Sequence, residues 1–336
     1  MLQYNKEFKQ LIEKSKNILV LTHRGPDMDA FCSMIMTKKF IESEYPQKHV
    51  IMKSKQTPTI NIPCMAEITV VEQLKSDDED LIIVTDASNL SLCLDFARDT
   101  LMDTTVPVIF IDHHKESVPD QDRLLINEFR SSASEQVFAT FKDIYGKDFK
   151  PTPAIAQLTQ YGIVADTGRF MYDATTPSTL RIYADAKEIM DVELEEMAYK
   201  MGKFPRESTP AIISYLKSLT IEDDMAYMYI SEDTIVKDGL TKQGINEAQN
   251  FLRDRYIRYI QGVHWGFIIR LDFSHENSWY VSFRSTKGYQ EVGKIAQLLN
   301  GGGHPYASAA RIDAQSGEEA LGKVLDAVHK VLDNQK

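Results

Sequence analysis

Three short, continuous apolar runs in the first half of the chain constrain its fold more than any other feature. They cover residues 18–22, 81–85 and 106–111, and helical patterns follow at about 29–42, 134–145, 152–165 and 177–190. Apolar runs of this length are typical of central strands in a parallel sheet that is covered on both faces. The alternation of strand and helix patterns therefore predicts an α/β fold, with a doubly wound, mainly parallel sheet.

The second half repeats the strand and helix signals after a charged, helical stretch at 191–219, which two prolines interrupt. Strands are expected at 226–230, 266–273, 279–284 and 309–312, with helices at 242–253, 291–299 and from about 318. This pattern predicts a smaller, mixed α/β domain. Because domains typically have ~100–200 residues, we expect a first domain at 1–190, a helical connector at 191–219 and a second domain at 220–336.

The acidic composition limits the partners that the protein can bind. The formal net charge is −11 and the pI is near 5.3, whereas affinity for long nucleic acid depends on many contacts of Lys and Arg with phosphates. The charge could also serve solubility alone. We expect a small anionic substrate at a local basic cluster, and neither long duplex nucleic acid nor a membrane as partner.

Cysteine usage and the first residues indicate the compartment. Cys32, Cys64 and Cys93 form no CxxC pair and are odd in number, which is typical of reduced thiols in the cytosol. Residues 1–17 have mixed charge and lack the apolar core of a signal peptide. No apolar run reaches the ~18 residues that a bilayer span requires. The sequence therefore predicts a cytoplasmic protein.

Four groups of metal-capable side chains stand where these strands or helices end, which is where open α/β sheets bind ligands. A lone Asp after a strand is usually a cap or turn residue, and a His pair alone can be a surface feature. Closely spaced carboxylates repel, however, and a divalent cation is the common remedy. The groups are His23, Asp27 and Asp29; Asp86; Asp112, His113 and His114; and Asp166, which precedes Gly168 at a helix end.

Imidazole and carboxylate donors without thiolate favour Mn²⁺ over Mg²⁺, which prefers oxygen ligands alone. The donors suffice for two ions. Two ions ~3.5–4 Å apart can hold a hydroxide and stabilise the attacking and leaving oxygens of phosphoryl transfer. A purely structural site would favour a closed, Cys-rich shell, which this chain cannot build.

The second domain has a complementary anion-binding pattern. The segment 281–287 is predicted to be a strand whose last residues are cations and hydroxyls, among them Arg284 and Ser285. The later run Gly301, Gly302, Gly303 and His304 places bare backbone amides beside an imidazole. An anion can approach such amides closely. The alternative is a flexible glycine turn beside an exposed strand end. Because this pattern comes after a domain with predicted metal ligands, it indicates a phosphate-binding site.

These motifs resemble the DHH phosphoesterase superfamily, in its members with the DHH-associated C-terminal domain. Size and domain content are most similar to the group of nano-RNases, pAp phosphatases and linear-dinucleotide phosphodiesterases. The metal motifs match in order, Gly301–His304 matches the C-terminal signature and Arg284-Ser285 matches the strand motif before it. Met28, Phe31-Cys32 and Ala307-Ser308 depart from the usual residues without removing a ligand, so they bear on pocket shape.

The resemblance implies a role for each matched residue. His23 and Asp27 would bind one Mn²⁺, Asp29, His113 and Asp166 the other, and Asp86 would bridge both. His114 and Asp112 would serve catalysis, with His114 orienting or protonating groups around the phosphate. The terminal phosphate would lie against Arg284, Ser285, the glycine amides of 301–303 and His304, and Ser134 would line the cleft.

The resemblance predicts a Mn²⁺-dependent phosphodiesterase that cleaves linear dinucleotides or very short oligoribonucleotides to 5′-mononucleotides by hydroxide attack, with pAp phosphatase activity in the same cleft. Alternatives are a polyphosphatase or pyrophosphatase, and an inactive nucleic-acid-binding module, which would have lost metal ligands. No G-x-S-x-G motif supports a serine hydrolase. Phe31, Tyr172, Tyr289 and Tyr306 are all candidates for stacking on a base. A homodimer is compatible with the resemblance, although the helices carry no decisive interface signal.

Overall fold

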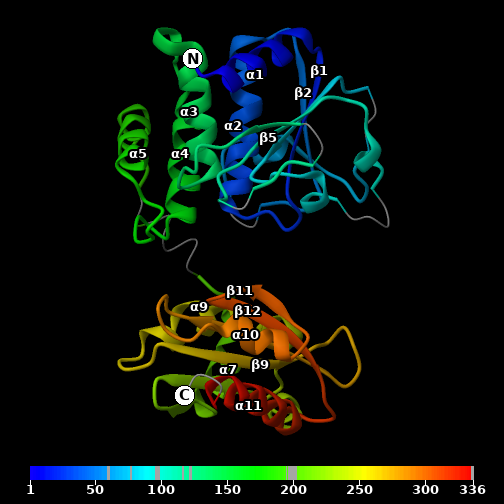
Figure 1. Cartoon of the computed structure of the whole chain (residues 1–336), viewed down its shortest axis with the longest axis vertical. Coiled ribbons are helices and arrows are strands. Elements are labelled where there is room, and N and C mark those ends of the chain that lie inside the picture. The colour runs from blue at the N-terminus through cyan, green and yellow to red at the C-terminus, as the bar shows by residue number, and fades with distance from the viewer. Residues whose placement is uncertain are drawn as a thin grey trace. The chain divides into compact units, whose positions relative to one another are not determined.

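The chain folds into two compact units, Met1–Met201 and Gly202–Lys336 (Figure 1). The computed structural model describes residues 1–58, 61–75, 78–94, 99–115, 117–120, 123–193, 195 and 203–333 of the 336. The boundary between the units falls inside the predicted connector at 191–219, part of which lies outside the described residues. Within the described part of the chain, no helix has the length and apolar character needed to cross a membrane.

The first unit contains a six-stranded sheet in the order β3-β2-β1-β4-β5-β6, with every neighbouring pair parallel. This confirms the predicted fold class. The apolar runs form the buried strands β1, β4 and β5, whereas the other three strands are only partly buried and were not expected from the sequence. The strands are β1 (Asn17–Thr22), β2 (His49–Ser54), β3 (Ile68–Val70), β4 (Leu81–Thr85), β5 (Val108–Ile111) and β6 (Leu124–Ile126).

Helices cover one face of this sheet. The helices α2, α3 and α4 pack against one another there, and α5 lies on the outer side of α4 (Figure 1). On the opposite face, Leu90 of the 3-10 turn η2 and Leu101 of the 3-10 turn η3 belong to the same apolar cluster as Phe110 of β5. The helices are α1 (Gln3–Lys14), α2 (Met28–Glu44), α3 (Ala133–Tyr145), α4 (Pro153–Asp166) and α5 (Pro177–Ile189). The turns are η1 (Met65–Glu67), η2 (Leu90–Leu92), η3 (Leu101–Asp103) and η4 (Gly146–Asp148).

The second unit contains a mixed six-stranded sheet in the order β11-β12-β10-β9-β8-β7. The pair β8 and β9 is parallel and the other pairs are antiparallel. The strands are β7 (Thr220–Glu222), β8 (Met225–Tyr229), β9 (Trp265–Leu271), β10 (Ser278–Ser285), β11 (Gly302–His304) and β12 (Ala307–Asp313).

Two apolar layers, one on each face, hold this second sheet. One layer includes α10 and α11, and the other includes α7 and α9. Tyr215 of α7 is fully buried, so the end of the predicted connector packs into the second unit. The helices and turns are η5 (Arg206–Ser208), α7 (Thr209–Lys217), α8 (Glu232–Lys237), α9 (Lys242–Arg255), η6 (Ile257–Tyr259), α10 (Val292–Leu298) and α11 (Gly317–Asp333).

Candidate metal centre

The strand order of the first sheet reverses direction between β1 and β4, and open parallel sheets bind ligands at such a switch point. Because all six strands are parallel, the residues that follow β1, β4 and β5 meet at one edge. The end of α4 brings Asp166 to the same place. Three overlapping groups of donors lie here, each with ligand atoms within 4.8 Å of one another. They are His23, Asp27 and Asp86; Asp29, His113 and Asp166; and Asp86, Asp112, His113 and His114.

Asp86 belongs to two of these three groups, and it also lies next to His113, a member of the third. Its Oδ2 lies 3.3 Å from Nε2 of His23, and its Oδ1 lies 3.3 Å from Nε2 of His113. The carboxylate is buried, and its Oδ1 receives no hydrogen bond of good geometry. The backbone of Asp86 adopts a φ of 59°, which Asp tolerates better than most residues, and its N–H donates to Ile111 at 2.9 Å. An orphaned buried carboxylate oxygen between two imidazoles fits a cation ligand.

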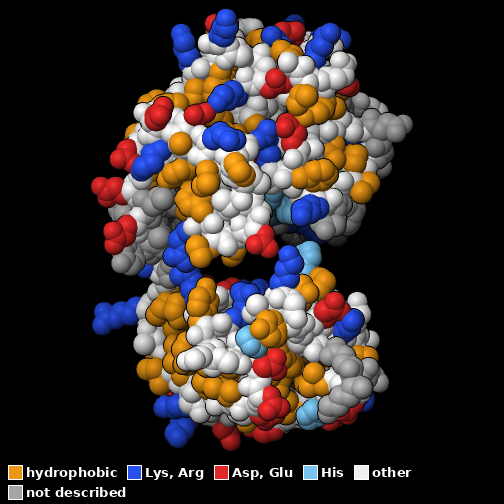
Figure 2. Space-filling model, turned by 60° about the vertical axis from the view of Figure 1, so that its left-hand side comes forward, with side chains coloured by type: hydrophobic (Ala, Val, Ile, Leu, Met, Phe, Trp, Pro, Cys, Tyr) orange, Lys and Arg blue, Asp and Glu red, His pale blue; other side chains and the backbone are white. Residues whose placement is uncertain are grey.

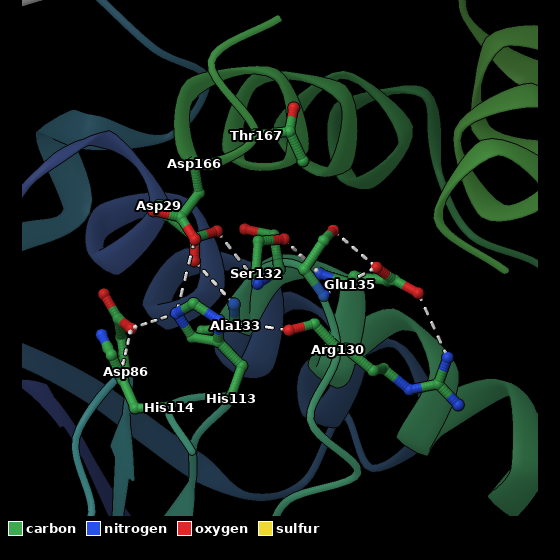
Figure 3. Close-up of polar contacts among 12 residues, drawn as sticks. Asp29, Asp86, His113, His114, Arg130, Ser132, Ala133, Glu135, Asp166 and Thr167 are labelled. Carbon is green, nitrogen blue, oxygen red and sulfur yellow. Dashed lines mark hydrogen bonds and ion pairs between the residues drawn. The ribbon is translucent and has the colours of Figure 1, made fainter. Parts of the chain in front are cut away.

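Backbone carbonyls fix the orientation of both histidines. Nδ1 of His23 donates to the carbonyl of Arg24 at 2.8 Å, and Nδ1 of His113 donates to the carbonyl of Arg130 at 3.3 Å (Figure 3). Each ring therefore carries a proton on Nδ1, and Nε2 faces the carboxylates. This is the arrangement that holds a metal-binding imidazole in one tautomer.

Asp29 is fixed by the first turn of α3. The N–H of Ala133 donates to Oδ2 of Asp29 at 2.6 Å, and the N–H of Ser134 donates to Oδ1 at 3.0 Å (Figure 3). Free amides at a helix N-terminus stabilise a carboxylate. Ser134 is fully buried behind Asp29, and a Cβ added at Gly162 of α4 would lie 2.0 Å from its Oγ. The expected contact of Ser134 with substrate stays a prediction.

Asp112 differs from Asp86 because hydrogen bonds from the chain itself reach both of its oxygens. Its Oδ1 accepts hydrogen bonds from the N–H of His113 and from Nδ1 of His114, both at 2.8 Å, and its Oδ2 accepts from the Ser117 hydroxyl. The side chain of His114 remains 57% exposed. Asp112 therefore orients His114, whose Nε2 is left for chemistry.

The electrostatics of the centre favour a bound cation. Burial acts against the charged histidines, but the bond with Asp86 raises the pKa of His23 to about 9 and that of His113 to about 10. Burial likewise acts against Asp86, yet the bonds with His113 and His23 lower its pKa to about 2. Burial raises the pKa of Asp166 to about 6, and burial together with the charge of Asp86 raises the pKa of Asp29 well above its usual value. These carboxylates destabilise one another's charge, and a divalent cation would relieve that repulsion. The donor set therefore fits the ions that the sequence predicted.

We expect Mn²⁺ to stabilise the first unit selectively. An ion that binds only the folded state adds about 2.7 kcal/mol to the free energy of unfolding at 100 times its Kd. Both tryptophans of the chain, Trp265 and Trp279, lie in the second unit, so their fluorescence reports that unit alone. Titration with Mn²⁺ should raise the far-UV circular dichroism midpoint and leave the tryptophan transition in place. Equal shifts in both signals would contradict a centre confined to the first unit.

In the second unit, two guanidinium groups bind one carboxylate and a third lies near them. Nε of Arg284 donates to Asp254 at 3.0 Å, Arg253 also binds Asp254, and Nη1 of Arg258 lies 3.5 Å from the carbonyl of Ser285. Burial, and then the charge of Arg253, lower the pKa of Arg284. Positive charge is thus in surplus here. Arg253 and Arg258 were missed in the sequence analysis, although the basic run at 253–258 could have indicated them.

The glycine motif forms the edge strand β11 rather than a flexible turn. Its backbone pairs with β12, with Gly302 opposite Ala309 and His304 opposite Ala307. Gly303 adopts a φ of 132°, and a Cβ at Gly301 would lie 2.2 Å from the Ala309 carbonyl. Both glycines are therefore required by the hairpin itself. His304 is exposed at its tip, whereas Ser285 is buried.

Two features together are typical of a metal-dependent phosphoesterase. His and Asp donors lie at the switch point of a parallel sheet, and a second domain with a glycine-histidine hairpin follows. Residues 17–163 match the DHH family, N-terminal domain, and residues 224–334 match the DHHA1 domain. The chain belongs to the DHH family, with a DHHA1 domain as its second part. This confirms the resemblance and the enzyme class.

Named relatives cover nearly the whole chain. It is 27% identical to the bifunctional oligoribonuclease and PAP phosphatase NrnA of Bacillus subtilis, over 91% of this chain and 92% of that protein. Identity is also 27% to the probable protein of that name from Streptococcus mutans, over 90% and 93%. The fold is similar to that of an exopolyphosphatase-related protein from Bacteroides fragilis, with a TM-score of 0.78, 20% identity and coverage of 97% and 96%.

Proposed function

We propose that the protein is a phosphodiesterase that hydrolyses linear dinucleotides or very short oligoribonucleotides to 5′-mononucleotides, and that it also removes the 3′-phosphate of pAp. The observation that carries this proposal is the pair of donor groups that share Asp86 at one sheet edge. The names of the relatives that match over nine-tenths of the chain support the substrate class.

In this proposal, two of the donor groups supply the ligands of two ions. His23 and Asp27 would hold one ion, and Asp29, His113 and Asp166 the other. Asp86, which lies in the first group and has its Oδ1 3.3 Å from Nε2 of His113, would bind both. When bound, the ions would activate water and neutralise the charge that develops on the phosphate. The mixed nitrogen and oxygen donors favour Mn²⁺.

His114 supplies the proton for the leaving oxygen in this proposal. Its Nδ1–H is held by Asp112 at 2.8 Å, which leaves Nε2 as the atom that exchanges protons with substrate. Removing His114 should lower kcat more than it raises KM, because a positioned acid contributes typically 10²–10⁴-fold in the transition state.

The arginine cluster supports recognition of a terminal phosphate. The positive charge of three guanidinium groups, those of Arg253, Arg258 and Arg284, exceeds the negative charge of the one carboxylate, Asp254. A guanidinium can bind phosphate through two hydrogen bonds. His304 and the amides of β11 are further candidates for this contact. On the face that Figure 2 shows, acidic and basic side chains are interspersed rather than gathered into a broad basic surface. With a net charge of −11, this favours short substrates over long nucleic acid. The cytoplasmic location and a homodimer stay predictions.

A hydrolysis panel with Mn²⁺ tests the proposal. The substrates are pApA, pGpG, pAp, a five-nucleotide RNA, cyclic di-AMP and tripolyphosphate, with products separated by chromatography. An Asp112→Ala/His113→Ala double variant runs beside the wild type. We expect mononucleotides from the dinucleotides and none from the variant. Phosphate release from tripolyphosphate alone, with inert nucleotides, would overturn the proposal in favour of a polyphosphatase.

A further inference from the structure

His264 and Tyr289 form a stacked pair of rings at one end of the second sheet. Their centroids are 3.7 Å apart and their planes meet at 15°. Tyr289 is 47% exposed although one face of its ring is covered by His264. We propose that this pair is the platform on which the nucleobase of the phosphate-bearing terminal nucleotide stacks. This inference rests on the proposed function and adds the subsite for the base.

The strand register places the pair beside the arginine cluster. Arg284 of β10 lies opposite Gly266 of β9, and the N–H of Thr286 donates to the His264 carbonyl at 2.9 Å, which extends the ladder by one more pair. His264 stands two residues before Gly266, so its side chain is on the same face of the sheet as Arg284. Diagonal neighbours in an antiparallel pair lie ~7–8 Å apart, within reach of long side chains.

A tight turn carries Tyr289 back over the imidazole. The N–H of Tyr289 donates to the Thr286 carbonyl at 3.1 Å, and Gly288 between them adopts a φ of 90°. A turn with positive φ at its third residue requires glycine there. The turn fixes the backbone of Tyr289 and the stack on His264 restrains its ring, which limits the entropy lost when a ligand stacks on it.

The structure distinguishes Tyr289 from the other aromatic candidates of the sequence. Phe31 is buried in the core of the first unit. Tyr172 is exposed in that unit, but its ring lies against Gly168, where an added Cβ would be 2.6 Å from ring atoms. Tyr306 is half-buried, and its carbonyl accepts a hydrogen bond from Ser285. Of the four, Tyr289 alone combines an exposed ring with an aromatic support beside surplus positive charge.

The stacking contact makes a specific kinetic prediction. Tyr289→Leu keeps apolar bulk but removes the aromatic face, so KM for pApA should rise about tenfold or more with kcat nearly unchanged, as expected for loss of one base–aromatic stack. Tyr289→Phe should retain the wild-type KM. A pApA analogue with an abasic 5′ residue should bind weakly to the wild type, and Tyr289→Leu should weaken it no further.

A binding measurement separates this inference from the proposed function. Calorimetry compares 5′-AMP with ribose 5-phosphate on the wild type and on Tyr289→Leu, and tryptophan fluorescence checks the fold of the second unit. Selective loss of the preference for 5′-AMP supports the platform, even if no dinucleotide is cleaved. Cleavage of pApA with the same KM in Tyr289→Leu, or equal 5′-AMP affinity in both proteins, overturns it while the hydrolytic function stands.

Discussion

Replacing Asp86 with Asn should lower kcat/KM for dinucleotide hydrolysis by at least about 10³-fold, which corresponds to a loss of about 4 kcal/mol of transition-state stabilisation. Asp86 faces His23 through one oxygen and His113 through the other, at 3.3 Å each. Asn has nearly the same shape and tolerates a φ of 59°, but it has no charge and offers one acceptor oxygen instead of two. The two ions would therefore lose the charged carboxylate that faces both His23 and His113.

The Asp86→Asn experiment measures activity together with bound metal per chain. We expect the fold to survive and the metal content to fall with activity. Asp148→Asn is the matched control, because Asp148 is exposed in the same unit and far from the donor groups in sequence. An Asp86→Asn protein that keeps more than a tenth of wild-type activity with a full metal complement would refute the shared-ligand role.

Replacing Glu135 with Ala should destabilise the first unit by about 3–5 kcal/mol, the usual result of removing one partner of a buried ion pair. Glu135 is fully buried, and its Oε1 accepts from Arg130 at 3.2 Å (Figure 3). Its Oε2 accepts from the Ser131 backbone at 3.1 Å, the Ser131 hydroxyl at 2.6 Å and Thr179 of α5 at 2.8 Å. In the Glu135→Ala variant, all of these donors lose the carboxylate that accepts their hydrogen bonds.

The change should also reach the metal centre, because the carbonyl of Arg130 is the group that orients His113. Far-UV circular dichroism should show the midpoint of the first unit falling by roughly 10 °C, while tryptophan fluorescence of the second unit stays unchanged. Glu188→Ala, on the exposed side of α5, is the control and should change stability by less than about 0.5 kcal/mol. A loss below about 1 kcal/mol for Glu135→Ala would show that this network contributes little.

The candidate metal ligands could be found from the sequence for two reasons. Each one follows a strand or ends a helix that the sequence pattern marks, and the ends of parallel strands lie at one edge of the sheet. Apolar runs mark the strands, and a parallel sheet brings the ends of its strands to a common edge. His23, Asp86 and His113 could therefore be grouped before any contact was known. The strand β2 and the edge strands β3 and β6 escaped the same reasoning, because they are only partly buried and their apolar runs are shorter.

The roles within the centre depended on contacts between distant parts of the chain. Asp29 is held by amides of α3 that are 104 and 105 residues away in sequence, and no spacing rule predicts that pairing. Asp112 and Asp86 look alike as residues that follow buried strands. The tertiary structure separates them, because hydrogen bonds fill the oxygens of Asp112 and leave an oxygen of Asp86 open.

The sequence by itself thus determined the fold class, the donors of the metal centre and the glycine-histidine motif, since each is written in residue type and short-range spacing. Only the tertiary structure decided which aromatic ring stacks on His264, and that Arg253 and Arg258 lie near Arg284. Those side chains meet through strand register and the docking of α9 on the sheet. Such contacts arise from packing of the whole unit, which no local pattern specifies.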